Sequence, residues 1–115
     1  MAKKSAHQNR IEMLQGTLDL LVLQTLRWGP QHGYGIARMI QANSQQALQV
    51  ETGSLYPALH RLERDKLVKA EWTTTGNRRR ARVYTLTAAG RKRLGEAEES
   101  WTALAKGVGR LLRCV

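Results

Sequence analysis

Apolar residues follow the three-and-four spacing of α-helices over most of the chain, which predicts a largely helical protein. A short helix is expected over Gln8–Leu14, and a second, apolar-rich helix should follow Gly16-Thr17. Asp19 would lie in the first turn of that second helix, where a carboxylate interacts favourably with the helix dipole. Trp28-Gly29-Pro30 should end it, because glycine caps helices and proline cannot continue them.

A further helix is expected from about Gly33 to Asn43, with Ile36, Ala37 and Ile40 facing inward. A polar, glutamine-rich segment, 41–49, would form the turn before the next helix. A helix, a turn and a second helix in this order are the parts of a helix-turn-helix unit.

The helix after that turn contains a proline. With Ser54 as N-cap, Pro57 occupies the third helical position, in the first turn, where its missing N–H would have no intrahelical partner. At about 100° per residue, Leu55, Leu59 and Leu62 share one face. The opposite face carries Gly53, Pro57, His60, Arg61 and Arg64, with Tyr56 at the border.

Two segments rich in β-forming residues come next, Val68–Thr74 and Arg82–Thr87. Gly76-Asn77 lies in the turn between them. The pattern predicts a two-stranded hairpin loaded with arginine. A short helix beside a basic hairpin is how winged-helix proteins hold DNA.

The last helix should begin after Thr87 as N-cap. Its apolar residues alternate spacings of three and four, a heptad pattern that indicates a helical partner. They are Leu94, Ala97, Trp101, Leu104, Val108, Leu111 and Val115. This stripe can pack inside the monomer or on a second copy, and a protruding amphipathic helix on a basic domain favours a homodimer.

The predicted fold class is therefore mostly α with a two-stranded β-wing. Residues 1–87 would form a winged helix-turn-helix domain with an N-terminal helix, and residues 88–115 a C-terminal dimerisation helix. A chain of 115 residues suffices for one core but not for two, so both parts should form one continuous globular unit.

The net charge of +10 and the pI near 10.7 indicate a polyanionic partner, either nucleic acid or an anionic membrane surface. From Gly76 to Arg93 there are seven basic residues and no acidic one. These are Arg78, Arg79, Arg80, Arg82, Arg91, Lys92 and Arg93. Charge concentrated in this way favours a docking surface for DNA.

Other kinds of function find little support. The single cysteine, Cys114, excludes an internal disulfide and fits a reducing cytosol, where we expect the protein to act. No apolar run approaches the ~18 residues of a membrane span. His7, His32 and His60 lack metal-ligand spacing, and no nucleophile–base grouping or phosphate-binding glycine loop appears. We expect no metal, no cofactor and no enzymatic activity.

Several motifs resemble those of the PadR-like transcriptional regulators. The opening helix 16–23 and the string His32-Gly33-Tyr34-Gly35-Ile36 are similar to that family's first two helices. The segment 54–63, which contains Leu55-Tyr56-Pro57-Ala58-Leu59, resembles its recognition helix, and 84–91 resembles its wing-to-helix junction. The junction motif is shared by several winged-helix families. The string His32-Gly33-Tyr34 followed at this separation by Leu55-Tyr56-Pro57-Ala58-Leu59 is far more specific.

The resemblance implies a homodimeric repressor whose C-terminal helices form the interface, in the subgroup with a single C-terminal helix. One departure is Lys66, where the family usually has glycine. Because residues other than glycine rarely adopt the left-handed conformation, the preceding helix is expected to end differently here.

The expected DNA-binding residues lie in two segments. On the recognition helix they are Thr52, Ser54, Tyr56, Pro57, His60, Arg61 and Arg64. On the wing they are Asn77, Arg78, Arg79, Arg80 and Arg82. Arg61 could reach guanine acceptors and the wing arginines could bind phosphates. The alternatives are a solvated amphipathic face, with Tyr56 packed between helices, and an ordinary solvated turn.

In some relatives the dimer interface encloses a flat, hydrophobic pore, so Trp101 could contact a small hydrophobic or aromatic effector. The more ordinary interpretation of Trp101 is a residue that fills the helix interface, and Trp28 and Trp72 are expected to be structural.

Two functions remain. One is a dimeric, sequence-specific repressor on a pseudo-palindromic operator. The other is an architectural module that binds nucleic acid by charge alone.

Overall fold

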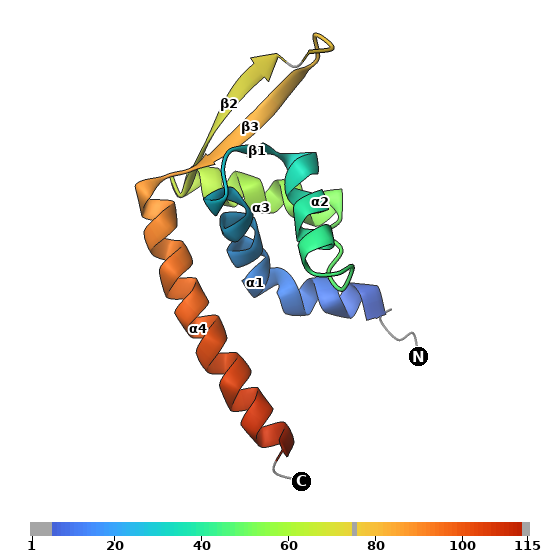
Figure 1. Ribbon diagram of the computed structural model, residues 1–115, viewed down its shortest axis with the longest axis vertical. Helices are drawn as coiled ribbons and strands as arrows, with labels where there is room; N and C mark the ends of the chain where they lie inside the picture. Colours follow the sequence, from blue (N-terminus) through green and yellow to red (C-terminus); the bar gives the residue numbers. More distant parts are fainter. Residues whose placement is uncertain (1–5, 75, 114–115) are drawn as a thin grey trace.

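The computed structural model describes residues 6–74 and 76–113, and the side-chain surroundings from residue 17 onward. The elements are α1 (Ala6–Arg27), β1 (Gln31–His32), α2 (Gly33–Asn43), α3 (Thr52–Arg64), β2 (Val68–Thr74), β3 (Arg80–Leu86) and α4 (Ala88–Arg113). In Figure 1, α1, α2 and α3 form a helical body, the β2–β3 hairpin extends from one end, and α4 runs away toward the other. The molecule measures 57 × 37 × 25 Å. Cys114 and Val115 lie outside the described residues.

The first two expected helices are one continuous helix, α1, of 22 residues. Gly16 does not interrupt it, because an interior glycine costs only about 1 kcal/mol relative to alanine. Asp19 therefore lies in the interior of α1, beyond the reach of the N-terminal dipole, and the expected stabilisation there was wrong.

The stop after α1 is confirmed. The amide of Gly29 donates to the carbonyl of Leu26 at 3.2 Å, and Gly29 has φ +140°, which only glycine adopts without strain. Helix α2 has the predicted bounds, Gly33–Asn43, and buries Ile36 and Ile40. These local signals position the helix-turn-helix unit as expected.

The sheet has three strands in the order β1-β3-β2, not the two that were predicted. Strand β1 pairs antiparallel with β3 through Gln31↔Tyr84 and His32↔Val83. Two residues show no periodicity, so β1 could not be detected in the sequence. Strand β3 pairs with β2 from Val68↔Leu86 to Thr74↔Arg80, and it begins two residues earlier than predicted. The start of α2 is thereby tied to the wing, the name used here for the β2–β3 hairpin with its turn.

The core draws on every helix and on the wing. Its most deeply buried side chains are Val22, Leu23, Leu26, Ile36, Leu55, Leu59, Leu62, Val68 and Leu94. Leu55, Leu59 and Leu62 face inward as the helical wheel predicted, joined by Ala58. The buried hydroxyl of Thr25 donates to the carbonyl of Leu21 at 3.0 Å, so it has a partner.

Helix α3 ends in the geometry that is typical of glycine, although Lys66 stands there. Lys66 has φ +61°. The amide of Leu67 donates to Leu62 O at 2.9 Å and that of Lys66 to Glu63 O at 3.0 Å, the two bonds of a Schellman motif. The prediction of a different ending was wrong. Leu62 and Leu67 are both buried, and this apolar contact supports the strained residue between them.

Thr87 caps α4 as predicted: its hydroxyl oxygen accepts from the Gly90 amide at 3.0 Å. Gly90 itself packs against the backbone just before β2, because a side-chain carbon there would overlap the carbonyl oxygen of Leu67. Beyond this junction α4 meets α1, where Arg27 and Glu98 form an exposed ion pair at 3.3 Å.

The heptad stripe of α4 divides into two parts. Leu94 is only 1% exposed and belongs to the core of the chain itself, so it has no surface left for a partner, contrary to expectation. Ala97 is half-buried. Farther along, Trp101, Leu104, Val108 and Leu111 are 46–74% exposed.

None of the helices in the described part of the chain is long and apolar enough for a membrane span.

Candidate nucleic-acid interface

Helix α3 presents a polar face that is open to solvent. Leu55, Ala58, Leu59 and Leu62 are buried, which leaves the remaining side chains of its first two turns outward. The exposed residues are Thr52, Gly53, Tyr56, Pro57, His60 and Arg64, whereas Ser54 and Arg61 are half-buried. Seven of these eight, all but Gly53, were predicted DNA contacts, and five of the seven are exposed.

The start of α3 differs from the prediction. Its N-cap is Glu51, with no side-chain capping bond, and Ser54 is the third helical residue. Pro57 is consequently the sixth residue, inside the helix, where its nitrogen cannot donate to the Gly53 carbonyl. The first turn is held by the amides of Ser54 and Leu55, which donate to Glu51 O at 3.0 and 2.9 Å.

Tyr56 connects α3 with the beginning of α2. A side-chain carbon on Gly33 would lie 2.8 Å from the Tyr56 hydroxyl oxygen, so the phenol ring covers the backbone of this glycine. Gly33 is buried while Tyr56 keeps 40% of its surface exposed. Tyr56 therefore packs between two helices and reaches solvent, which combines both interpretations of this residue.

The beginning of α2 carries aromatic groups that the sequence did not mark as a site. His32 caps the helix, with its Nδ1 accepting from the Gly35 amide at 3.0 Å. Its ring is nearly parallel to that of Tyr34, with centroids 6.5 Å apart. The guanidinium of Arg38 lies 5.7 Å from the centroid of Tyr34, which is exposed. The only sequence signal for this part of the site was Tyr34 in the first turn of the helix, with Arg38 four positions later.

The wing arginines have different surroundings. Asn77, Arg78 and Arg79 are exposed near the turn, where Arg78 has φ +59°. Arg80 and Arg82 lie 4.8 and 5.5 Å from the centroid of the Trp72 ring.

Arg82 also has an acidic partner. It donates to Glu63 Oε2 of α3 at 2.6 Å, and both side chains are about one third exposed. The sequence from Gly76 to Arg93 contains no acidic residue, but the fold brings this carboxylate to Arg82 from 19 residues away. Arg82 thus joins the wing to α3. Beneath it, burial raises the pKa of the Tyr84 phenol, with Arg82 opposing the rise, so Tyr84 stays neutral near pH 7.

The wing, α3 and the beginning of α2 line an open groove of about 740 Å³, called the wing groove here. It is lined by Tyr34, Tyr56, His60, Trp72, Arg79, Arg80 and Arg82, among others. Aromatic faces and guanidinium groups are the residue types that bind sugars, bases and phosphates. Five of the predicted site residues meet in this groove, together with Tyr34 and Trp72, which were not predicted as site residues.

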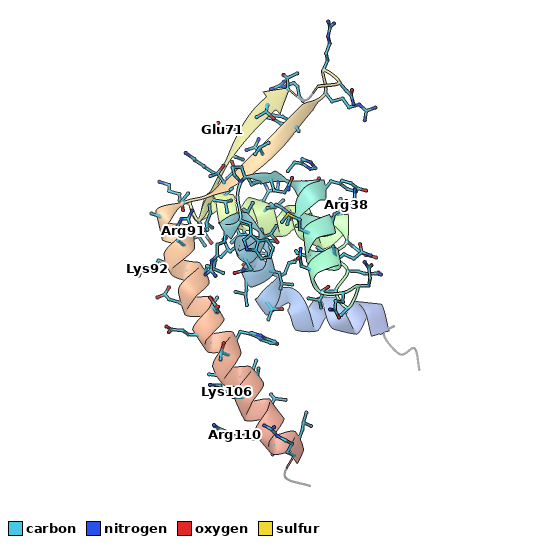
Figure 2. All side chains as sticks on the ribbon, viewed as in Figure 1. Arg38, Glu71, Arg91, Lys92, Lys106 and Arg110 are labelled. Atoms are coloured by element: carbon cyan, nitrogen blue, oxygen red, sulfur yellow. The ribbon has the colours of Figure 1, made fainter. Side chains whose placement is uncertain are left out.

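Other basic residues lie elsewhere. Arg61 donates to Asp19 Oδ1 of α1 at 3.0 Å, and Arg64 pairs with Asp65 at 3.3 Å. In Figure 2, Arg91 and Lys92 project from the first turns of α4, on the side of the body away from Arg38. Neither lines the wing groove. The basic run that is continuous in the sequence is therefore divided in space.

No metal centre accompanies these groups in the described part of the chain, where no cluster of three histidine, cysteine or acidic side chains occurs. A helix-turn-helix followed by a hairpin, with an open polar helix face beside arginines, defines a winged helix-turn-helix protein. This is the fold class predicted from the sequence, apart from the third strand.

The family follows from comparison with known proteins. The model of the transcriptional regulator PadR-like family matches residues 22–96, well over half of the chain, and the chain belongs to this family. It is thus a transcriptional regulator of a DNA-binding kind, and not an enzyme.

Individual relatives agree. The chain is 42% identical over 72 residues to the transcriptional regulator Rv3488 of Mycobacterium tuberculosis, a match that covers 63% of this chain and 66% of that protein. The chain is also 33% identical to a PadR family transcriptional regulator from Eggerthella lenta whose crystal structure is known. That match covers 95% of this chain and 93% of the other, with a TM-score of 0.76. A regulator from Clostridium thermocellum, 24% identical, shares the fold with a TM-score of 0.79 over 86% of this chain and 96% of its own.

Proposed function

We propose that this protein is a homodimeric repressor that binds a pseudo-palindromic operator in double-stranded DNA. The observation that carries the proposal is the wing groove, which unites the exposed face of α3 with the arginines of the wing. The exposed face of α3 enters the major groove, while the wing lies along the flanking backbone. The net charge of +10 supplies the attraction to phosphate.

Within this proposal the residues have separate tasks. Thr52, Tyr56 and His60 are exposed at the front of α3 and approach base edges and the nearest phosphates. Ser54 and Pro57 shape the same turn. Arg61 and Arg64 already have acidic partners, so they contact the backbone only by exchanging these partners for phosphates.

The wing residues Asn77, Arg78, Arg79 and Arg80 bind phosphates or enter the minor groove. The phosphate contacts raise affinity for all sequences alike, since phosphates carry no base information. Sequence preference is therefore assigned to α3 and overall affinity to the wing.

Dimerisation is assigned to the outer part of α4. Trp101, Leu104 and Val108 are large apolar side chains exposed on one stripe of a helix that leaves the body of the molecule. Burying such a stripe against its symmetry mate removes apolar surface from water, at about 25 cal/mol per Å². Two-fold pairing of α4 places two copies of α3 on one side, which matches two half-sites of an operator.

Regulation by a small hydrophobic or aromatic effector completes the proposal. Trp101, exposed within the stripe, would form a flat contact for such a molecule between the two subunits. The effector releases DNA only if it binds more tightly to the subunit arrangement that DNA does not favour. Trp101 as a simple filler of the interface is the competing interpretation.

Selection of bound duplexes from a random-sequence pool, at near-physiological salt, tests the central claim. Enrichment of an inverted repeat supports a sequence-specific dimer, and a mobility shift with the DNA upstream of the protein's own gene then tests that region as an operator. An architectural module would instead enrich no motif, and its affinity would fall steeply with salt. That second function is favoured only by the three consecutive arginines of the wing.

A further inference from the structure

Trp72 is expected from the sequence to be a structural tryptophan, but its side chain is 55% exposed on the wing. Strand register places it directly opposite Arg82. Because alternate residues of a strand share a face, Arg80 stands on that same face, one diagonal step away. The large apolar side chain of Trp72 is thus exposed to solvent beside two arginines of the neighbouring strand.

The guanidinium carbons of Arg80 and Arg82 lie 4.8 and 5.5 Å from the centroid of the Trp72 ring. Both distances are within the range of a cation–π interaction, which is strongest on tryptophan. A guanidinium that rests on a ring keeps the N–H donors in its own plane free for a phosphate. The contact restrains the arginine without using its hydrogen-bonding groups.

The two arginines differ in what else holds them. Arg82 is bound to Glu63 of α3 at 2.6 Å. Arg80 has no acidic partner within the described residues, and Trp72 is the neighbour that restrains it. Arg80 also lines the wing groove. Of these two arginines, the one without an ion pair is thus the one that depends on the tryptophan.

We propose that Trp72 is a positioning residue for DNA binding, which holds Arg80 at the wing groove for phosphate contact. Arg82, bound to Glu63, meanwhile fixes the wing against α3. The proposal rests on the proposed function, in which the wing contacts DNA. An arginine that is already held in place loses less rotamer freedom on binding, so more of the contact energy appears as affinity.

A double-mutant cycle on a random-sequence DNA duplex tests this, because a phosphate contact does not require the operator. Affinity is measured for the wild type, Trp72→Leu, Arg80→Ala and the double variant. An exposed cation–π contact is worth about 0.5–1 kcal/mol. Since 1.4 kcal/mol is a factor of ten, Trp72→Leu should weaken binding about two- to fivefold. In the Arg80→Ala background the same substitution should have almost no effect.

Salt dependence adds an independent measurement. Arg80→Ala should lower the slope of log affinity against log salt by about 0.9, the value for one lost phosphate contact. Trp72→Leu should keep the slope close to that of the wild type, since the charge stays. Trp72→Phe retains an aromatic face and should lie between the wild type and the leucine variant.

Trp28 offers a matched control. Its side chain is 56% exposed, it is not among the residues that line the wing groove, and no arginine lies over its ring in the described residues. Trp28→Leu should leave DNA affinity unchanged. Thermal unfolding of each variant checks that the fold persists, and the phenylalanine variant carries the test if Trp72→Leu unfolds.

The outcomes separate the two proposals. No change in affinity for Arg80→Ala would refute the phosphate contact of Arg80, and the positioning role with it, while the proposed contacts of Arg78 and Arg79 would still stand. A loss for Arg80→Ala together with a Trp72→Leu effect that persists in its background would keep the wing contact and overturn the positioning role. In that case Trp72 touches DNA directly or only supports the hairpin.

Discussion

Arg61 of α3 and Asp19 of α1 are 42 residues apart in sequence, and the guanidinium donates to the carboxylate at 3.0 Å. Both side chains are about one third exposed. The helical wheel places Arg61 on the face opposite the core, and it was expected to contact DNA, where it could reach guanine acceptors. In the fold, Arg61 joins α3 to α1 through this ion pair.

This ion pair predicts how Arg61→Ala behaves. Exposed ion pairs contribute about 0.2–1 kcal/mol to stability. In urea titrations, the free energy of unfolding should therefore decrease by an amount in that range. Affinity should fall alike for all DNA sequences. A double-mutant cycle with Asp19→Ala should show that the two residues are coupled, and a selective loss of preference at one base pair would instead identify Arg61 as a reader.

The contact of Tyr56 with Gly33 leads to a second prediction. Gly33→Ala should displace the phenol ring, because the new methyl group would lie 2.8 Å from its hydroxyl oxygen. The ring end of a side chain can move, so we expect a small loss of stability, within about 1 kcal/mol, and a clear loss of DNA affinity. Gly95→Ala on α4 is the control, since the space around Gly95 is open and it does not line the wing groove. Unchanged DNA affinity for Gly33→Ala would show that the position of Tyr56 is unimportant.

Gly90, at the junction of the wing and α4, should not tolerate a side chain. An added methyl group meets the carbonyl oxygen of Leu67, which is backbone and cannot move without distorting β2. Gly90→Ala should therefore lower the free energy of unfolding by about 1–3 kcal/mol. On the same helix, Gly95 has open space around it, and Gly95→Ala should stabilise by up to about 1 kcal/mol. Chemical denaturation of both variants measures the contrast, and equal effects would contradict the packing at this junction.

Lys66 holds the left-handed conformation that ends α3. The penalty for a residue with a side chain is about 1–2 kcal/mol, and glycine loses about 0.5–1 kcal/mol through its more flexible unfolded chain. Lys66→Gly should accordingly stabilise the protein by about 0.5–1 kcal/mol, observed as a higher midpoint of thermal unfolding. Lys66→Ala keeps the strain and should bring no such gain.

The exposed stripe of α4 yields the last prediction. Sedimentation at micromolar concentration should show a dimer for the wild type and a monomer for Val108→Glu, because a buried, unpaired carboxylate is costly. Thr102→Glu adds the same charge to an exposed position outside the stripe and should leave the dimer intact. A monomeric wild type, both free and on DNA, would refute the proposed assembly.

The bounds of most elements could be predicted because their signals are local. Gly29 and Pro30 stop α1, Thr87 caps α4, and alternation identifies the wing, each through residues only a few positions away. The predictions that were wrong concern positions where tertiary contacts override local preference. Helix α1 runs through Gly16, and Lys66 accepts a strained conformation because Leu62 and Leu67 pack together around it.

The sequence by itself determined the fold class, the order of the elements and the concentration of basic residues in and after the wing. Only the tertiary structure decided which of these residues have partners. It brings Glu63 to Arg82, Asp19 to Arg61 and Trp72 beneath Arg80, and it buries Leu94 in the core. The physical reason is range: helix signals and turn signals act between neighbours in sequence, whereas ion pairs, ring contacts and burial depend on atoms that only the folded chain brings together.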